Sequence, residues 1–253
     1  MFTVTTNHST EYEERTELTA DAPTLVEGLP GLGMVASIAV DQITTQLDLE
    51  QHGRIVSDDL PPVASFSDGR VRDPVRVYAG EDPAVMTLQS DVPVPPRAVE
   101  SLSECIMTDV AEEFDRAVLL AGAPAESEDE VGDVVGVATT DRLERALADA
   151  DIELADGTGI IGGVTGALLA ACYESDVPAA VLVVRSNPYI PDPAAARAVI
   201  EDALEPLVDF DIDTRELLEQ AEEIQAQKRR IAEQLQEYQQ SEGTQPSTPS
   251  MYQ

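Results

Sequence analysis

The sequence predicts an α/β fold in which a mainly parallel sheet is covered by helices on both faces. Two observations support this fold class. Short apolar runs alternate with helical patterns through most of the chain, as expected for parallel strands joined by helices. The runs are also apolar at consecutive positions, which is typical of strands buried on both faces, and glycine-rich turns connect some of them to the next helix.

The first α/β unit is the clearest. Residues 24–26 are a short apolar strand run, residues 28–33 are a turn with three glycines, and residues 34–47 carry apolar side chains at helical spacing. A strand, a glycine turn and a helix in this order open an α/β unit.

Residues 54–90 have a different pattern. Short apolar runs are interrupted there by pairs such as Pro61-Pro62 and Asp68-Gly69, which predicts hairpins of antiparallel strands that extend the sheet. A long helix is expected from Pro95 to about residue 114, because proline is tolerated in the first turn of a helix.

The second half of the chain returns to alternation. We expect strands at 117–122, 134–138 and 179–184, and helices at 142–150, 164–173 and 194–208. Thr140 and Asp192 precede two of these helices and are expected to cap them. The predicted α/β domain spans residues 23–212, after a polar segment, residues 1–22, whose structure the sequence leaves open.

The composition changes again at the C-terminus. Seven side chains of residues 213–240 follow one another at spacings of four and three, which predicts a coiled-coil helix: Leu217, Ala221, Ile224, Lys228, Ile231, Leu235 and Tyr238. The flanking positions are Glu, Gln and Arg, which favours self-association into a homo-oligomer over packing against the chain's own domain. Residues 241–253, rich in Ser, Thr, Pro and Gly, are expected to form a flexible tail.

Charge excludes several classes of partner. With 49 acidic and 15 basic residues the formal net charge is −34, which argues against nucleic acid and against anionic membrane surfaces. Lys228 is the only lysine. The excess of acidic residues and the near absence of lysine indicate a halophilic protein in which salt screens self-repulsion; the alternative is an acidic protein without that adaptation.

Cys105 and Cys172 are expected to be buried thiols in a reducing cytoplasm. No secretory signal or membrane helix is predicted.

Two glycine turns are candidate ligand sites. Gly31, Gly33 and Ala36 match the spacing of a dinucleotide-binding turn, and Gly162 with Gly163 form a second cluster before a helix. Both could face one crevice at the carboxyl ends of the strands. The alternative interpretation, which we favour, is a tight strand-to-helix turn that needs small residues.

Catalytic residue types are scarce. His8 and His52 are the only histidines, and the residues form no Ser-His-Asp set, zinc set or phosphate-binding lysine motif. We therefore predict no catalytic residues, no metal and no cofactor.

The chain ends in Met251, Tyr252 and Gln253. A tyrosine in front of a free carboxylate is a group that a pocket for C-termini can bind. Composition alone gives a hydrophobic-Tyr-any ending in roughly 1% of cases.

Three motifs resemble a known family. Residues 28–37 (GLPGLGMVAS), 159–166 (GIIGGVTG) and 187–193 (NPYIPDP) resemble archaeal, halophilic-type relatives of the proteasome assembly chaperones, over roughly residues 20–240. The resemblance implies a three-layer sandwich similar to purine nucleoside phosphorylases, no enzymatic activity, and homo-oligomers. It also implies that Met251, Tyr252 and Gln253 insert between α-subunits of the proteasome core particle.

The leading hypothesis is thus a non-catalytic, oligomeric protein that binds the proteasome through its tail, as an assembly chaperone or as an activator. A nucleotide- or nucleoside-binding enzyme that uses Gly31, Gly33, Gly162 and Gly163 is the alternative. A third hypothesis is an oligomeric scaffold with an incidental tail.

Overall fold

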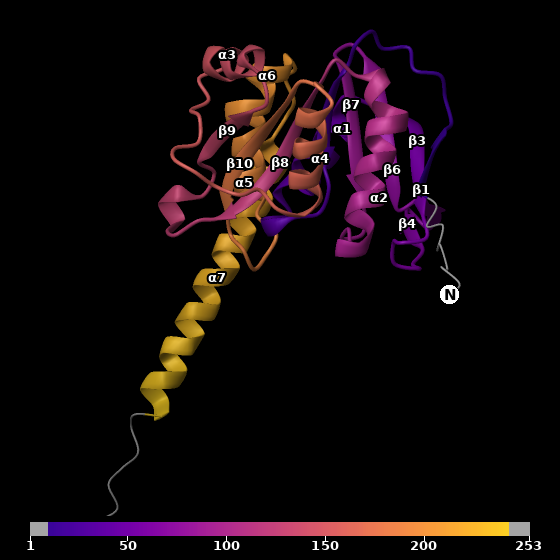
Figure 1. The fold of residues 1–253 in the computed structure, drawn as a ribbon. Helices are drawn as coiled ribbons and strands as arrows, with labels where there is room; N and C mark the ends of the chain where they lie inside the picture. Colours follow the sequence, from indigo (N-terminus) through magenta and orange to yellow (C-terminus); the bar gives the residue numbers. More distant parts are fainter. Residues whose placement is uncertain (1–9, 243–253) are drawn as a thin grey trace, which may run out of the picture.

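One large mixed sheet runs through the molecule. In the computed structural model, which describes residues 10–242, eight strands lie in the order β1-β3-β6-β7-β2-β8-β10-β9 (Figure 1). The strands are β1 (Thr10–Glu14), β2 (Thr24–Gly28), β3 (Glu50–Ser57), β6 (Val75–Glu81), β7 (Ala84–Ser90), β8 (Arg116–Pro124), β9 (Val134–Ala138) and β10 (Ala179–Ser186). A separate small hairpin consists of β4 (Ser65–Ser67) and β5 (Arg70–Arg72).

The prediction of a mainly parallel sheet is wrong. The strands β7, β2, β8 and β10 are parallel to their neighbours in this group, but β1, β3 and β6 pair antiparallel on one side and β9 pairs antiparallel with β10 on the other. The connection from β8 to β9 is too short for a crossover, because a parallel return needs a dozen or more residues. The strands β7, β2, β8 and β10 all end on the same side of the sheet. We call this side, which is formed by the ends of strands, the carboxyl edge, and the opposite side the amino edge.

Helices cover both faces, so the predicted three-layer sandwich is confirmed. On one face lie α1 (Val35–Gln46), α3 (Asp141–Asp149), α5 (Pro193–Val199) and α6 (Glu205–Val208); on the other lie α2 (Val99–Cys105) and α4 (Gly163–Glu174). Alternation along β2 divides its side chains between the two cores: Val26 packs with the first layer and Leu25 with the second. Cys105 and Cys172 are buried free thiols, as predicted.

Both predicted helix caps are confirmed. The Thr140 hydroxyl accepts a hydrogen bond from the backbone N–H of Leu143, and the Asp192 carboxylate accepts one from Ala195. The predicted helix 194–208 is divided by a wider turn at Ile200–Leu204, and α2 is likewise extended by irregular turns to Glu113.

The polar N-terminal segment joins the sheet. Residues Thr10–Glu14 form β1, which pairs with β3 from Thr10 opposite Ser57 to Glu14 opposite Gly53. The predicted boundary of the α/β domain at residue 23 is therefore too late for these residues.

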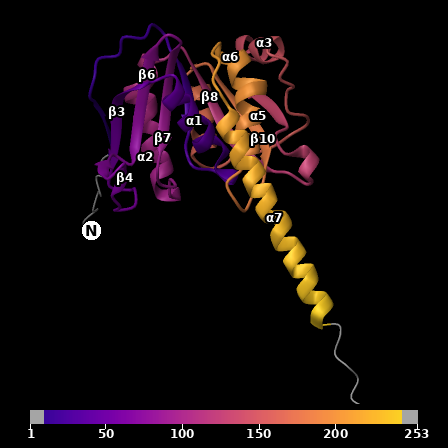
Figure 2. The same ribbon diagram turned by 180° about the vertical axis from the view of Figure 1, so that it is seen from behind.

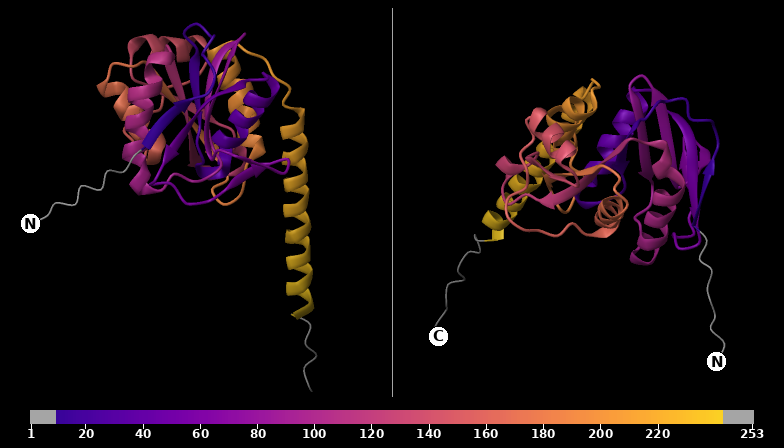
Figure 3. Two further views of the ribbon diagram at one scale, coloured as in Figure 1. Left: turned by 90° about the vertical axis from the view of Figure 1, so that its right-hand side faces the viewer. Right: turned by 45° about the horizontal axis from the view of Figure 1, so that its top comes forward.

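The C-terminal helix α7 (Arg215–Glu242) is 28 residues long and leaves the body. It starts at the amino edge, where Gln46 at the end of α1 exchanges hydrogen bonds with the backbone of Asp213. It runs back along α5 and extends beyond the carboxyl edge (Figures 2 and 3). Within residues 10–242, no helix combines the length and apolar character that crossing a membrane requires.

Candidate functional site

The first glycine turn is required by packing. A Cβ atom on Gly28 would lie 2.5 Å from Cβ of Val40 in α1, and one on Gly122 of β8 would lie 2.3 Å from the Leu32 carbonyl oxygen. Such distances are far inside van der Waals contact. These glycines allow the turn to pass between β8 and α1.

Gly33 is constrained twice. Its φ of +66° lies in the left-handed region, and a Cβ there would be 2.7 Å from Oγ of Ser186 in β10. The Gly33 carbonyl accepts a hydrogen bond from Asp192 N, at 2.8 Å, which joins the turn to the start of α5. The fold itself therefore requires a glycine at position 33.

The second glycine turn has more open surroundings. Added Cβ atoms on Gly157, Gly159, Gly162 and Gly163 would meet no atom within 4 Å, although Gly163 has a φ of +68°. Only Gly166, inside α4, is closely approached, by the Ile161 carbonyl. Packing therefore explains few of the glycines in this turn.

A buried carboxylate connects the two turns. Glu27 is 0% exposed at the carboxyl end of β2. One of its oxygens accepts a hydrogen bond from Leu29 N, and the other accepts from Leu120 N and from the Thr165 hydroxyl at the start of α4. Burial raises the pKa of Glu27 to about 7, although the three hydrogen bonds oppose this shift. Glu27 thus holds β2, β8 and α4 together beneath both turns.

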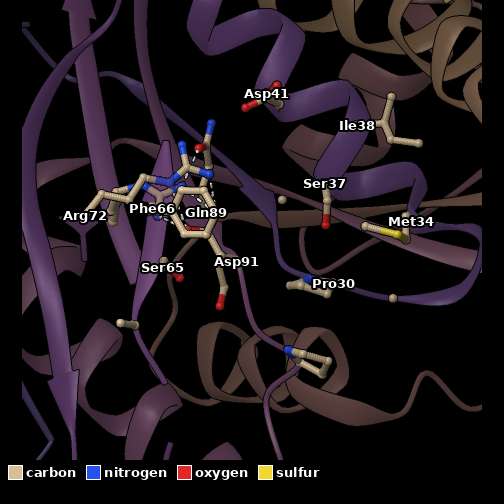
Figure 4. Close-up of a pocket in the computed structure, with 16 residues that line it drawn as sticks. Pro30, Met34, Ser37, Ile38, Asp41, Ser65, Phe66, Arg72, Gln89 and Asp91 are labelled. Atoms are coloured by element: carbon tan, nitrogen blue, oxygen red, sulfur yellow. Dashed lines mark hydrogen bonds and ion pairs between the residues drawn. The ribbon is translucent and has the colours of Figure 1, made fainter. Parts of the chain in front are cut away.

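A crevice of about 750 Å³ lies outside the carboxyl ends of β2 and β7. Gly31 lines it, together with α1 and the β4–β5 hairpin, but Gly33, Gly162 and Gly163 do not. The two glycine turns therefore do not share this crevice. Figure 4 shows Phe66 and Arg72 on one side of it and Ser37, Ile38 and Asp41 of α1 on the other.

Two arginines and one carboxylate form the polar wall of the crevice. Both oxygens of Asp91 accept hydrogen bonds from Arg72 and from Arg76, at 2.7–2.9 Å. Burial alone would raise the pKa of Asp91, but the two guanidinium groups outweigh it and hold this pKa below its usual value. Arg76 is 1% exposed and also donates to Tyr78 and Gln89. Its guanidinium group is therefore hydrogen-bonded to groups of the protein itself.

The remaining polar groups leave the crevice without an evident reaction. The Ser37 hydroxyl is buried and has no hydrogen-bond partner, and burial raises the pKa of Asp41 despite the nearby arginines. Neither group lies within a hydrogen-bonded nucleophile–base pair among the described residues. The volume of the crevice is within the range of ligand pockets.

Both ring nitrogens of His52 contact other groups of the protein. It is 2% exposed, with Nδ1 at 2.6 Å from the Thr16 carbonyl and Nε2 at 2.9 Å from Glu113. His8 lies outside the described residues. Across residues 10–242, no three His, Cys, Asp or Glu side chains are grouped as a metal site would need.

The first of the seven predicted coiled-coil positions is buried in the α/β domain. Leu217 is 1% exposed and belongs to the core formed with α1 and α5, so this residue packs within its own domain instead of facing a partner. Ala221 and Ile224 are half-buried and line a pocket of about 480 Å³ with Pro188 and Ile190. The side chains of Lys228, Ile231, Leu235 and Tyr238 lie outside the described part of the structure, as do Met251, Tyr252 and Gln253.

Glu27, Arg72 and Asp91 were not singled out by sequence reasoning. For Glu27 there was a usable signal, since it is the one charge in the apolar run that ends β2. Arg72 and Asp91 are 19 residues apart and meet only because β6 and β7 form a hairpin.

Known proteins resemble this chain over most of its length. An uncharacterised protein of Methanocaldococcus jannaschii is 27% identical over 226 residues, which cover 89% of this chain and 92% of that protein. Among solved structures, Pyrococcus furiosus PbaA, described as an archaeal homologue of proteasome-assembly chaperone, superposes with a TM-score of 0.78 at 25% identity, covering 92% of this chain and 96% of that one. Pyrococcus furiosus PbaB, described as an archaeal proteasome activator, has a TM-score of 0.79 at 20% identity over 88% of this chain and 98% of that one, a likeness of fold. Residues 25–232 match the PAC2 family, and the chain therefore belongs to the PAC2 family.

Proposed function

We propose that this protein is a non-catalytic proteasome-binding protein, an assembly chaperone or an activator, that docks on the core particle through Met251, Tyr252 and Gln253. The observation that carries the proposal is the likeness to PbaA in both sequence and fold over nearly the whole chain. The direction of α7 supports it, because this helix carries the chain away from the body toward its C-terminus.

Each residue of the tail has a chemical role in this proposal. The Gln253 carboxylate pairs with a basic group between α-subunits, and the Tyr252 ring packs against the wall of the pocket. Contacts of this size are weak singly. Linking several tails in one homo-oligomer, through the exposed part of α7, raises the effective concentration and can add 10²–10⁴ in avidity.

The test is binding of purified core particle in molar salt by three full-length chains and one deletion. The unaltered chain and Tyr173→Ala, which changes a 68% exposed tyrosine on α4, are expected to bind equally. The deletion of 251–253 and Tyr252→Ala are expected to lose binding. Equal recovery of core particle by the deletion would contradict docking through the tail.

We also propose that the protein works in a salt-rich cytoplasm. The support is its net charge of −34 and its single lysine. Because the Debye length falls to about 3 Å at 1 M salt, self-repulsion is screened there. The unfolding midpoint is expected to rise between 0.1 and 2 M KCl; a constant midpoint would contradict the adaptation.

A further inference from the structure

Exposed apolar side chains are concentrated on one side of the molecule. The described residues expose ten large hydrophobic side chains, and seven of them lie at or beside the carboxyl edge. The five that we call the edge patch are Met34, Phe66, Val71, Ile160 and Tyr189, with exposed fractions of 44%, 73%, 79%, 98% and 90%. On a chain of net charge −34, exposed apolar side chains gathered on one side are a candidate interaction surface.

The topology explains why these residues meet at one edge. Met34 follows β2 and Tyr189 follows β10, and both strands end there. Ile160 precedes α4, which runs back from that edge toward the start of β10. Phe66 and Val71 are paired across the β4–β5 hairpin, which connects the end of β3 with the start of β6 at the same edge.

The two loops that carry Met34 and Tyr189 are held together by hydrogen bonds. Tyr189 N donates to the side-chain oxygen of Asn187 at 2.9 Å, and Asn187 N donates to Asp192 at 2.7 Å. Asp192 N in turn donates to the Gly33 carbonyl, which links this loop to the turn that carries Met34. Met34 and Tyr189 are thus presented by two loops that hydrogen bonds connect.

The C-terminal helix leaves from the same edge. Ala221 and Ile224 are level with Pro188 and Ile190 of the Tyr189 loop, since the four residues line one pocket. Eighteen residues of α7, 225–242, follow Ile224, and they extend about 27 Å beyond the carboxyl edge at 1.5 Å per residue. Residues 243–253 can span up to about 36 Å. The chain is therefore long enough for Tyr252 to reach back to the level of the edge patch.

We propose that the edge patch is a second docking surface for the partner that Met251, Tyr252 and Gln253 bind, the proteasome core particle. This inference rests on the proposed function. The chemistry calls for an apolar partner surface with basic groups at its rim, because the exposed carboxylates of Glu153 and Asp156 precede Ile160 in the same loop. A partner held by the tail lies on the side of the molecule where the patch is exposed, and the second contact fixes its orientation.

The experiment measures the affinity of full-length chains for purified core particle, together with the native mass of each chain. The patch variant is Ile160→Ser with Tyr189→Ser, and the two substitutions cost little stability because both side chains are at least 90% exposed. The matched control is Tyr173→Ser, since Tyr173 is 68% exposed at the end of α4 on the amino edge. The third chain lacks 251–253.

We expect the patch variant to bind at least about tenfold more weakly at unchanged native mass, and the control to bind normally. Normal binding by the patch variant, with binding lost in the deletion, would overturn the patch and leave the proposed function standing. Weak binding by the patch variant with normal binding by the deletion would support the patch and contradict docking through the tail. A lower native mass in the patch variant would show that a second copy covers the patch, which also overturns the proposal.

Discussion

The two glycine turns at the carboxyl edge look alike in sequence and differ in what surrounds them. In residues 28–33, Gly28 and Gly33 are pressed against Val40 and Ser186, so no larger side chain fits. In residues 157–163, the four glycines face open space and Ile160 is 98% exposed. The first turn serves the packing of the sandwich, whereas the second is part of the surface.

This difference means that the same glycine pattern can come from steric need in one turn and from an exposed surface in another. The same spacing arises in the first turn because a backbone must pass between β8 and α1. Substitutions at the glycines of the two turns can separate steric need from a role at the surface.

Gly33→Ala is expected to give the largest loss of stability. The alanine would be strained at a φ of +66° and its Cβ would lie 2.7 Å from Ser186 Oγ. Together these effects cost about 3–4 kcal/mol. The measurement is chemical unfolding in a constant high-salt buffer, and a loss below about 1 kcal/mol would contradict the packing account.

Glu27→Gln tests the carboxylate that connects the turns. Since burial raises the pKa of Glu27 to about 7 in the folded state, the folded chain binds more protons than the unfolded one. The stability that protonated Glu27 contributes is fully present below about pH 4.5 and is lost as the pH rises through about 7. The variant, which lacks this titration, should therefore gain about 3 kcal/mol relative to the unaltered chain between pH 4.5 and pH 8. A pH-independent difference between the two unfolding free energies would refute this role of Glu27.

Gly163→Ala separates backbone strain from packing. Gly163 has nearly the same φ as Gly33 but no neighbour within 4 Å of an added Cβ. Only the strain remains, which costs about 1 kcal/mol. Unfolding measured beside Gly33→Ala should rank the two variants clearly, and equal losses would remove the contrast between the turns.

Gly162→Ala is expected to have the smallest effect. Its φ of −106° suits any residue, and the surroundings are open. We expect a change within about 0.5 kcal/mol. A larger loss would reveal a contact of the second turn that the fold does not explain.

Much of the fold could be predicted from sequence because its signals are local. The run at β2, the caps at Thr140 and Asp192, and the apolar runs of β8 and β10 depend only on neighbouring residues. Strand direction was not predictable in this way, because the apolar run of β9 would read the same in either direction. The acidic strand β1 lacks an apolar run and is fixed by its pairing with β3.

The candidate sites likewise combine features that depend on neighbouring residues with features that depend on residues distant in sequence. Gly31 and Gly33 were identified from their spacing, but their different roles depend on Ser186 and on the crevice, which are distant in sequence. Ile160 and Tyr189 lie in motifs that the sequence analysis singled out, yet only the shared edge shows that they belong to one surface.

We propose that the carboxyl edge and the tail face one partner, the proteasome core particle. The most direct measurement is electron cryo-microscopy of the complex between the full chain and purified core particle. The account predicts Met251, Tyr252 and Gln253 between α-subunits, with Ile160 and Tyr189 toward the core particle and α3 on the far side. A complex in which the amino edge contacts the core particle, or in which residues 251–253 are unbound, would contradict it.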